Sequence, residues 1–410
     1  MASTTLSSKK QAVTAAVDRL ADRLRQIALD IHATPEVGWD TPKAVAWLIA
    51  PLCEAGFTVE SPIAGLGSAF RATWDGGGGA GPTVGLLAEY DALRGIGHGC
   101  GHNLIGTAAV GAALALKAAA PDLAGRILVL GTPFEEGGGG KVVMAERGIF
   151  DALDAAMMVH PQRRTMIGRG GLACVSLTIR YHGKASHASS APELGISALD
   201  AVLQLFFGIN QLRQFAPAGH RIHGVITHGG VAPNIVPALA EAEILVRAVN
   251  RRELTGLTQR VRAIAEAAAA ATGARLEIEA GLIYAERYEN RALGQAFVAN
   301  LEALGEPVEP PTKGIGSSDM GNVMEVCPAI HPYVKISDEI NHSPEFTHAA
   351  ASERGMRGMI LAAKALAMTA LDVCQDPALV AAVKAEHAAF REAAGSAAEQ
   401  AAEKGPSAAL

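Results

Sequence analysis

Short apolar runs separated by polar turns and longer amphipathic stretches dominate the first part of the chain. Residues 83–88, 126–131 and 155–159 are short and apolar, which is typical of buried parallel strands. Residues 103–120 lie between the first two runs and consist of small apolar side chains, so they predict a tightly packed buried helix. Strands that alternate with helices in this way predict an α/β sheet.

Helices are predicted before this α/β region, and further helices and a strand are predicted near the end of the chain. Residues 10–33 carry apolar side chains at near-helical spacing, and residues 41–55 predict a second helix that ends at Gly56. Far along the chain the α/β pattern resumes, with a helix over 291–304, a strand over 329–334 and a helix over 349–369. The Ala/Glu-rich tail from Ala393 predicts a frayed helix.

The pattern changes between these two parts. Residues 172–181 alternate between apolar and polar side chains like a half-buried strand. A helix, two strands, a helix and a strand follow, over 197–214, 221–228, 240–249, 252–271 and 275–280. This order is the split βαβ arrangement, and the stretch is long enough to form a small inserted domain. We therefore expect a first domain segment over 1–172, an insertion over 173–289 and a second domain segment over 290–410.

Composition limits the class of protein. A chain of 410 residues is too long for one compact core, and 49% apolar with 19% charged residues predicts a soluble globular protein. The net charge of −6, without a basic stripe, argues against nucleic acid as a partner. We expect no apolar run that spans a membrane, and the polar N-terminus lacks the core of a secretion signal. Five scattered cysteines favour the reducing cytoplasm.

Three predicted strands each end in polar residues. The first delivers Glu89 and Asp91, the second Glu135 and Glu136, and the third His160. In open α/β sheets, ligands collect at the carboxyl ends of the strands. Cys100 and His102 lie close by among glycines, and a thiolate with an imidazole suits zinc or a neighbouring transition ion. The sequence therefore predicts a metal site at this edge of the sheet.

Two metal ions that share a bridging ligand need about five protein donors, with positions left open for water and substrate. Cys100 is the candidate bridge, because a thiolate has lone pairs for two ions, and Asp91 is placed to orient His102 or a water. His348 competes with His342 for one position. Taken alone, each residue has an ordinary structural explanation, and the set as a whole carries the inference. The predicted ligands are Cys100, His102, Glu136, His160 and His342.

Adjacent carboxylates on a turn point in different directions, so Glu136 can bind metal while Glu135 handles protons. A bound metal lowers the pKa of its water, and Glu135 takes the proton as the hydroxide attacks a carbonyl, then passes it to the leaving nitrogen. In the insertion, His187 is a candidate donor to the developing oxyanion. His228 and Asn234 belong to a glycine-rich polar turn, and Arg247 is a candidate partner for a substrate carboxylate.

Together these motifs resemble the dinuclear-metal amidohydrolases and peptidases of metallopeptidase clan MH. That group contains aminoacylases, the carboxypeptidase G type, indole-acetyl-amino-acid hydrolases and aminobenzoyl-glutamate hydrolases. The resemblance runs nearly end to end, from residues 31–36 to His342. It is closest to the β-alanyl-lysine (Xaa-Arg) dipeptidase branch, through residues 89–93, 99–105, 318–322 and 364–372.

The resemblance implies a mixed-sheet metallopeptidase catalytic domain with an inserted ferredoxin-like (βαββαβ) lid and dimerisation domain, and a homodimer built through that insertion. It implies two divalent ions, with zinc favoured over manganese or cobalt, held by the five ligands named above. Glu135 matches the catalytic base, His187 the histidine that reaches the partner's site, and Asn234 a substrate contact. Arg94 departs from the branch, which often has Pro there.

The predicted function is metal-dependent hydrolysis of the amide bond of a dipeptide or an N-acyl amino acid. A xenobiotic or folate-fragment amide is the alternative substrate within this class. A non-catalytic metal- or peptide-binding protein on the same fold is a second class, although the complete ligand set disfavours it. A cysteine hydrolase with Cys100 as nucleophile and His102 as base is a third, although two residues so close on one loop rarely align for proton transfer.

Overall fold

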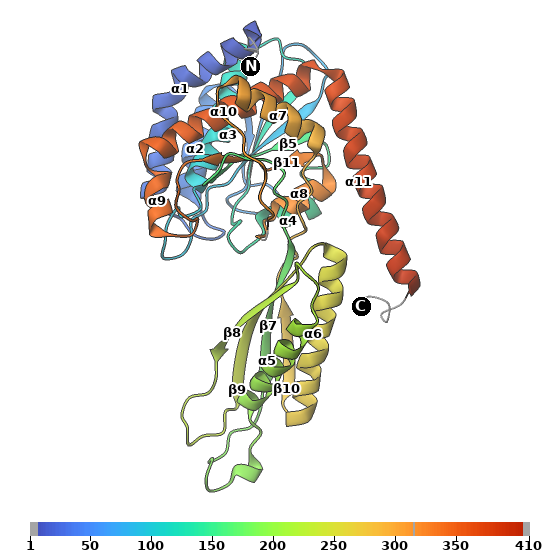
Figure 1. Cartoon of the computed structure of the whole chain (residues 1–410). Coiled ribbons are helices and arrows are strands. Elements are labelled where there is room, and N and C mark those ends of the chain that lie inside the picture. The colour runs from blue at the N-terminus through green and yellow to red at the C-terminus, as the bar shows by residue number, and fades with distance from the viewer. Residues whose placement is uncertain (1–6, 315, 405–410) are drawn as a thin grey trace. The chain divides into compact units, whose positions relative to one another are not determined.

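The computed structural model describes residues 7–314 and 316–404, which divide into two compact units (Figure 1). The first unit comprises Met1–Gly170, Tyr288–Lys313 and Asn322–Ala393. The second comprises Gly171–Arg287, Gly314–Gly321 and Ala394–Leu410. The domain bounds expected from the sequence stay a prediction, and each unit is described by itself below.

The first unit is built on a six-stranded mixed sheet in the order β1-β2-β4-β3-β5-β11. The strands β3, β4, β5 and β11 run parallel, as expected for buried apolar runs, and β2 adds to β4 in the antiparallel sense. The predicted bounds of β3 and β4 are confirmed, whereas the antiparallel strands β1 and β2 were missed. The strands are β1 (Thr58–Glu60), β2 (Phe70–Asp75), β3 (Thr83–Ala88), β4 (Arg126–Gly131), β5 (Ala155–Met157) and β11 (Ala329–Ile330).

Three long helices, α1 (Ser8–Ala33), α3 (His102–Ala119) and α10 (Glu353–Gln375), pack on one another, and α3 and α10 contact the sheet (Figure 1). The helix α2 (Pro42–Glu54) lies against α1 and α3. Small side chains let α3 approach β3 closely. A Cβ atom on Gly106 would lie 2.7 Å from the carbonyl oxygen of Glu89, so only glycine fits there. This approach holds the start of α3 beside the end of β3.

The expectation that no apolar run is long enough to span a membrane was wrong for α10. By length and composition alone, this helix passes the test for a membrane span. Most of the stretch is buried against α1, α3 and α7 (Arg291–Ala303). The core helix of a large α/β unit has the same apolar composition, and this burial explains it.

The last part of the chain differs from the prediction in detail. The strand expected over 329–334 is two short strands, β11 and β12 (Tyr333–Lys335), and β12 pairs with β6 (His160–Gln162) in a separate small sheet. The helix expected over 349–369 is divided into α9 (Pro344–Ala350) and α10, because Ser352 caps a new helix by accepting the N–H of Gly355. The remaining helices are α4 (Gly140–Glu146), α8 (Met320–Val326) and α11 (Pro377–Lys404). The predicted tail is helical as far as Lys404, and its residues 405–410 lie outside the described residues.

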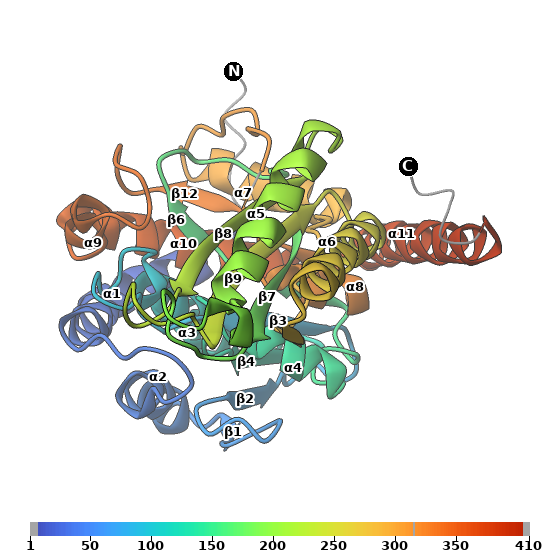
Figure 2. The same cartoon turned by 90° about the horizontal axis from the view of Figure 1, so that it is seen from below.

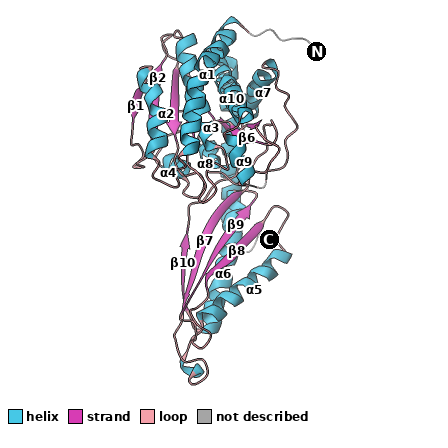
Figure 3. Cartoon of the chain, turned by 90° about the vertical axis from the view of Figure 1, so that its left-hand side faces the viewer, coloured by secondary structure: helices cyan, strands magenta, loops and turns pink. Residues whose placement is uncertain are grey.

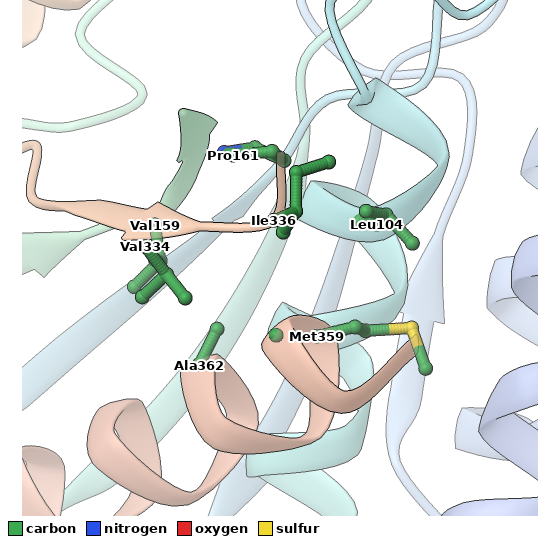
Figure 4. Close-up of a pocket in the computed structure, with 8 residues that line it drawn as sticks. Leu104, Val159, Pro161, Val334, Ile336, Met359 and Ala362 are labelled. Atoms are coloured by element: carbon green, nitrogen blue, oxygen red, sulfur yellow. The ribbon is translucent and has the colours of Figure 1, made fainter. Parts of the chain in front are cut away.

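A small apolar cavity of about 10 Å³ lies behind the small sheet (Figure 4). Leu104 of α3 and Met359 and Ala362 of α10 line it, together with Val334 and Pro161 of the paired strands. A cavity of this size with an almost entirely apolar lining hardly admits one water molecule. It is therefore a packing gap in the core and not a ligand site.

The second unit is a four-stranded antiparallel sheet in the order β10-β7-β9-β8 with two helices on one face (Figures 2 and 3). Alternate residues of β7, among them Leu177, Ile179 and Tyr181, are buried under the helices. The predicted βαββαβ order is confirmed. The elements are β7 (Ala173–His182), η1 (Pro192–Leu194), α5 (Ala198–Gln214), β8 (Arg221–His228), β9 (Leu239–Ala248), α6 (Arg251–Thr272) and β10 (Arg275–Ala280).

Candidate metal centre

Parallel strands bring their carboxyl ends to one edge of the sheet. Asp91 follows β3, Glu135 and Glu136 follow β4, and His160 follows β5, so all four residues reach this edge. The start of α3 adds His102, and the loop before it adds Cys100. The loop before α9 adds His342, whose N–H donates to the carbonyl of Gly99 at 2.8 Å.

The side chains of these residues form three overlapping groups, and within each group the possible ligand atoms lie within 4.8 Å of one another. The groups are Cys100 with His102 and His160, Cys100 with Glu136 and His342, and His102 with Glu135 and Glu136. Cys100, His102 and Glu136 each belong to two groups. Of these three, Cys100 carries the thiol, whose lone pairs suit a bridging ligand.

Individual distances fit ligation by metal ions. Cys100 Sγ lies 3.3 Å from His160 Nε2, and Glu136 Oε1 lies 3.5 Å from His342 Nε2 and 3.9 Å from His102 Nε2. Ligand atoms at the corners of a tetrahedron with bonds of about 2.1 Å are roughly 3.4 Å apart. Moreover, His102 Nε2 and Glu136 Oε1 are buried and have no hydrogen-bond partner among the described residues. Such atoms are costly unless something else satisfies them, and a cation would do so.

Hydrogen bonds fix which nitrogen of two imidazoles faces the cluster. His160 Nδ1 donates to the carbonyl of Pro161 at 2.7 Å, which leaves Nε2 unprotonated toward Cys100. Burial lowers the pKa of His160 to about 4, so the ring is neutral at neutral pH. His102 Nδ1 lies 3.2 Å from Asp91 Oδ1, and Asp91 Oδ2 accepts the N–H of Glu136 at 3.1 Å. Asp91 thus holds one imidazole and the glutamate turn together.

The cluster concentrates negative charge around a buried point. Burial alone would lower the pKa of His102, yet the carboxylates of Asp91 and Glu89 raise it well above its usual value. Burial alone would raise the pKa of Glu136, yet contacts with His342 and His102 lower it. Negative charge that is held away from water in this way favours a divalent cation.

The same surroundings argue against Cys100 as a nucleophile. Burial and the Glu136 carboxylate raise the pKa of the Cys100 thiol well above its usual value. Nucleophilic cysteines instead need a lowered pKa to form the thiolate. Coordination to a metal ion is the condition under which this thiol would lose its proton.

Backbone strain also marks the site. Among the described residues, three that are not glycine have a positive φ, and two of them are Phe134 (φ 53°), directly before Glu135, and His342 (φ 66°). Such conformations cost free energy and cluster at functional sites. His348 lies exposed on α9 and belongs to none of the three groups, so the geometry favours His342 over it. Gly101 (φ 81°) also packs so close to the Pro161 ring that a Cβ would lie 2.9 Å from it.

Three buried polar residues at this edge were not assigned to the predicted site. Glu89 follows β3 directly and was expected at this strand end together with Asp91, but only Asp91 was given a role. His331 follows β11 at the same edge, and its ring centroid lies 5.3 Å from that of His160. Lys141 is fully buried on α4 and pairs with Glu89, but nothing in the glycine run that precedes it signals this role.

The other four predicted site residues belong to the second unit, which divides them into two groups. His187 and Asn234 lie on paired segments, where Ala188 N–H donates to the carbonyl of Asn234 at 3.0 Å. His187 Nδ1 accepts the N–H of Ser190 at 3.2 Å, which leaves Nε2–H free to donate. His228 opposes Glu241 near this end of β9.

Arg247 lies six residues further along β9, roughly 20 Å away at the usual rise per residue. There it opposes Cys174, near the point where the chain enters the second unit, and its Nη1 donates to Ser317 Oγ at 2.7 Å.

A cluster of thiol, imidazole and carboxylate groups that could hold metal ions, at the carboxyl edge of an α/β sheet, together with a separate βαββαβ unit, is typical of two-domain metallohydrolases. Residues 167–273 match the family described as "Peptidase dimerisation domain" (M20). The Xaa-Arg dipeptidase of Mus musculus is 39% identical over 90% of this chain and 90% of its own length. The chain therefore belongs to the M20 peptidase family and is a hydrolase.

Two further similarities agree with this assignment. One of the subunits of the p-aminobenzoyl-glutamate hydrolase of Escherichia coli (strain K12) is 37% identical over 70% of this chain and 64% of its own length. The crystal structure of the Bacillus subtilis YXEP protein, described as a dinuclear metal binding peptidase of this family, has a TM-score of 0.67 at 20% identity, covering 87% of this chain and 99% of that one. The predicted family and fold class, with its dimerisation domain, are confirmed.

Proposed function

We propose that this protein hydrolyses the amide bond of a dipeptide at a centre of two divalent ions, with Glu135 as the proton-transferring residue. The observation that carries the proposal is the cluster at the carboxyl edge of the sheet, where Glu135 lies within 4.8 Å of candidate ligand atoms of His102 and Glu136. The mouse relative is named for dipeptides that end in arginine, so dipeptides with a basic C-terminal residue are the first substrates to test.

The residues that would hold the ions are Cys100, His102, Glu136, His160 and His342. When bound, the ions would polarise the amide carbonyl and lower the pKa of water at the site. One thiol, three imidazoles and one carboxylate form a donor set that suits zinc, with manganese and cobalt as alternatives.

The protein's own groups would carry the proton steps. Glu135 takes the proton of the attacking water and delivers it to the leaving nitrogen, because a carboxylate beside the ligands can reach both. His187 can donate Nε2–H to the developing oxyanion, since its Nδ1 is already an acceptor. Asn234 and His228 would contact the substrate near His187, and Arg247 would pair with the substrate carboxylate.

We also propose a homodimer through the second unit. Leu203 and Phe207 are 51% and 67% exposed one turn apart on α5, and Val225 on the adjoining edge strand β8 is 60% exposed. A strand edge flanked by apolar side chains is the usual form of a partner surface. Because roughly 20 Å of strand separate Arg247 from the His187 end within the second unit, we propose that the two residues serve different centres of the dimer.

The test is a substrate panel under defined metal. The protein is stripped with a chelator, reloaded with zinc, manganese or cobalt, and assayed on dipeptides with basic C-terminal residues, N-acyl amino acids and aminobenzoyl-glutamate. We expect hydrolysis that the chelator abolishes and metal restores, with dipeptides preferred. Hydrolysis that ignores the chelator would contradict the proposal, and preference for aminobenzoyl-glutamate would support the folate-fragment alternative instead.

The role of Glu135 is tested by Glu135→Gln. This variant should bind the same number of ions as the wild type, because Glu135 is not a proposed ligand. Its kcat should fall about 10²- to 10⁴-fold, the usual contribution of a positioned acid–base group. Wild-type turnover in this variant would remove Glu135 from the mechanism.

A further inference from the structure

An ion pair lies buried beneath the metal cluster, and the proposed chemistry does not use it. Lys141 Nζ lies 2.5 Å from Glu89 Oε1, and the two side chains are 0% and 1% exposed. Removing two charges from water costs several kcal/mol per ion, and their attraction often does no more than offset that cost. Stability alone therefore gives a weak reason for burying this pair.

The pair connects two segments that carry the site. Glu89 directly follows β3, two residues before Asp91, and its second oxygen Oε2 lies 3.3 Å from His102 Nε2. Lys141 lies in the first turn of α4, five residues after Glu136. The ion pair thus joins the end of β3, which holds Asp91, to the helix that follows the glutamate turn.

The glutamate turn needs such a connection because of the residues that follow it. Residues 137–140 are all glycine, which gives the backbone more freedom than any other residue type. Before these glycines, the turn is anchored at the end of β4, and the N–H of Glu136 donates to Asp91 Oδ2. The carbonyl of Phe134 also accepts the N–H groups of Gly138 and Gly139. After them, Lys141 is the first side chain that can anchor the chain.

We propose that Lys141 and Glu89 are positioning residues whose ion pair holds the Glu135–Glu136 turn in register with His102. The inference rests on the proposed function, because its consequence is the correct placement of Glu135 against the ligands. Misplacement of a reacting group by about 1 Å can lower turnover 10²-fold, even when the change lies outside the reacting atoms.

The test uses Lys141→Met, Glu89→Gln and the double variant that carries both changes. We expect each single variant to lower kcat about 10²-fold while KM changes much less, and to weaken zinc binding about 10- to 100-fold, as loss of a partner behind a ligand does. The double variant should be no worse than either single variant, because one tether is lost in all three.

The matched control is Lys10→Met, which breaks a partly buried lysine ion pair elsewhere in the first unit. Lys10 Nζ lies 2.7 Å from Asp372 Oδ2 and 2.7 Å from Asn300 Oδ1, and these contacts join α1 to α10 and α7. This change should lower the thermal midpoint and leave kcat and zinc affinity as in the wild type.

The outcomes separate positioning from stability. If Lys141→Met lowers the thermal midpoint but keeps wild-type kcat and zinc affinity, as Lys10→Met should, the pair is only structural and the proposal is overturned. If the single variants do not fold, the double variant provides the test, because it leaves neither Lys141 nor Glu89 as an unpaired buried charge. A wild-type kcat in the double variant would overturn the proposal. If the wild type shows no chelator-sensitive turnover, the proposed function fails, and zinc affinity alone still tests the tether.

Discussion

Asp91→Asn is the sharpest perturbation of the metal centre, because the Asp91 carboxylate serves two donors at once. Oδ1 lies 3.2 Å from His102 Nδ1, and Oδ2 accepts the N–H of Glu136 at 3.1 Å. An asparagine has the same shape but only one acceptor oxygen, and its NH₂ group donates. If the NH₂ group faces His102, the ring must carry its proton on Nε2, the atom that faces the cluster. If it faces Glu136, two donors meet and the turn loses its anchor.

Either outcome leaves one buried donor or acceptor without a proper partner, and such a group raises the free energy of the site by about 1–3 kcal/mol. Loss of a hydrogen-bond partner behind a metal-bound histidine weakens metal affinity about 10- to 100-fold, or roughly 1.4–2.7 kcal/mol. These two independent figures agree. We therefore expect the zinc Kd of Asp91→Asn to rise by one to two orders of magnitude.

The assay is competition for zinc against a chromophoric chelator at neutral pH, with circular dichroism to confirm folding. Asp154→Asn is the matched control, because Asp154 Oδ2 also accepts a backbone N–H, from Thr83 at 2.7 Å, and its other oxygen pairs with Lys384. Asp154 precedes β5 at the amino edge of the sheet, so its loss should cost stability but no zinc affinity. An unchanged zinc Kd in Asp91→Asn would refute the role of Asp91.

Two further predictions concern pH and assembly. Burial, with the nearby His102 and His32, lowers the pKa of His98 to about 3 from 6.5, so the unfolded chain binds more protons between these values. The free energy of unfolding should then fall by up to about 1.4 kcal/mol per pH unit below pH 6.5, and it should fall less steeply in the His98→Gln variant. The measurement is urea unfolding of both proteins at several pH values in the presence of chelator. An equal dependence of the free energy of unfolding on pH in the two proteins would contradict this prediction. Phe207→Lys should convert the proposed dimer to monomers in sedimentation velocity. Leu29→Lys on α1, an exposed apolar site of the first unit, should leave the sedimentation unchanged. A dimeric Phe207→Lys variant would place the interface elsewhere.

The elements that could be predicted are those whose signal is local. Strands β3, β4, β8 and β10 have the predicted bounds, because each is a short run closed by turn residues or by a change of pattern. The polar residues after β3, β4 and β5 could be predicted to lie close together, because the carboxyl ends of parallel strands meet at one edge of the sheet. Topology thus converts three separate local signals into one site.

Features that depend on contacts between distant segments could not be predicted. The edge strands β1 and β2 are short, and their pairing with β4 leaves little mark on their own sequence. The distance between Arg247 and His187 depends on the register of β9 with its neighbours. His331 and Tyr333 were predicted to belong to one continuous strand. The break between them was not predicted, because it depends on the pairing of β12 with β6, the strand that begins at His160.

The ion pair of Lys141 and Glu89 shows why residues behind the ligands escape a reading of the sequence. A candidate ligand can be recognised in the sequence because it is a thiol, an imidazole or a carboxylate at the end of a predicted strand. A lysine after a glycine run is instead expected to be a solvated surface residue. Its burial becomes evident only when Lys141 on α4 meets Glu89 at the end of β3, and Gly106 contributes by letting α3 approach the carbonyl of Glu89. The precision of the glutamate turn therefore depends on residues with the weakest local signal, so substitutions there should impair turnover more than their sequence positions suggest.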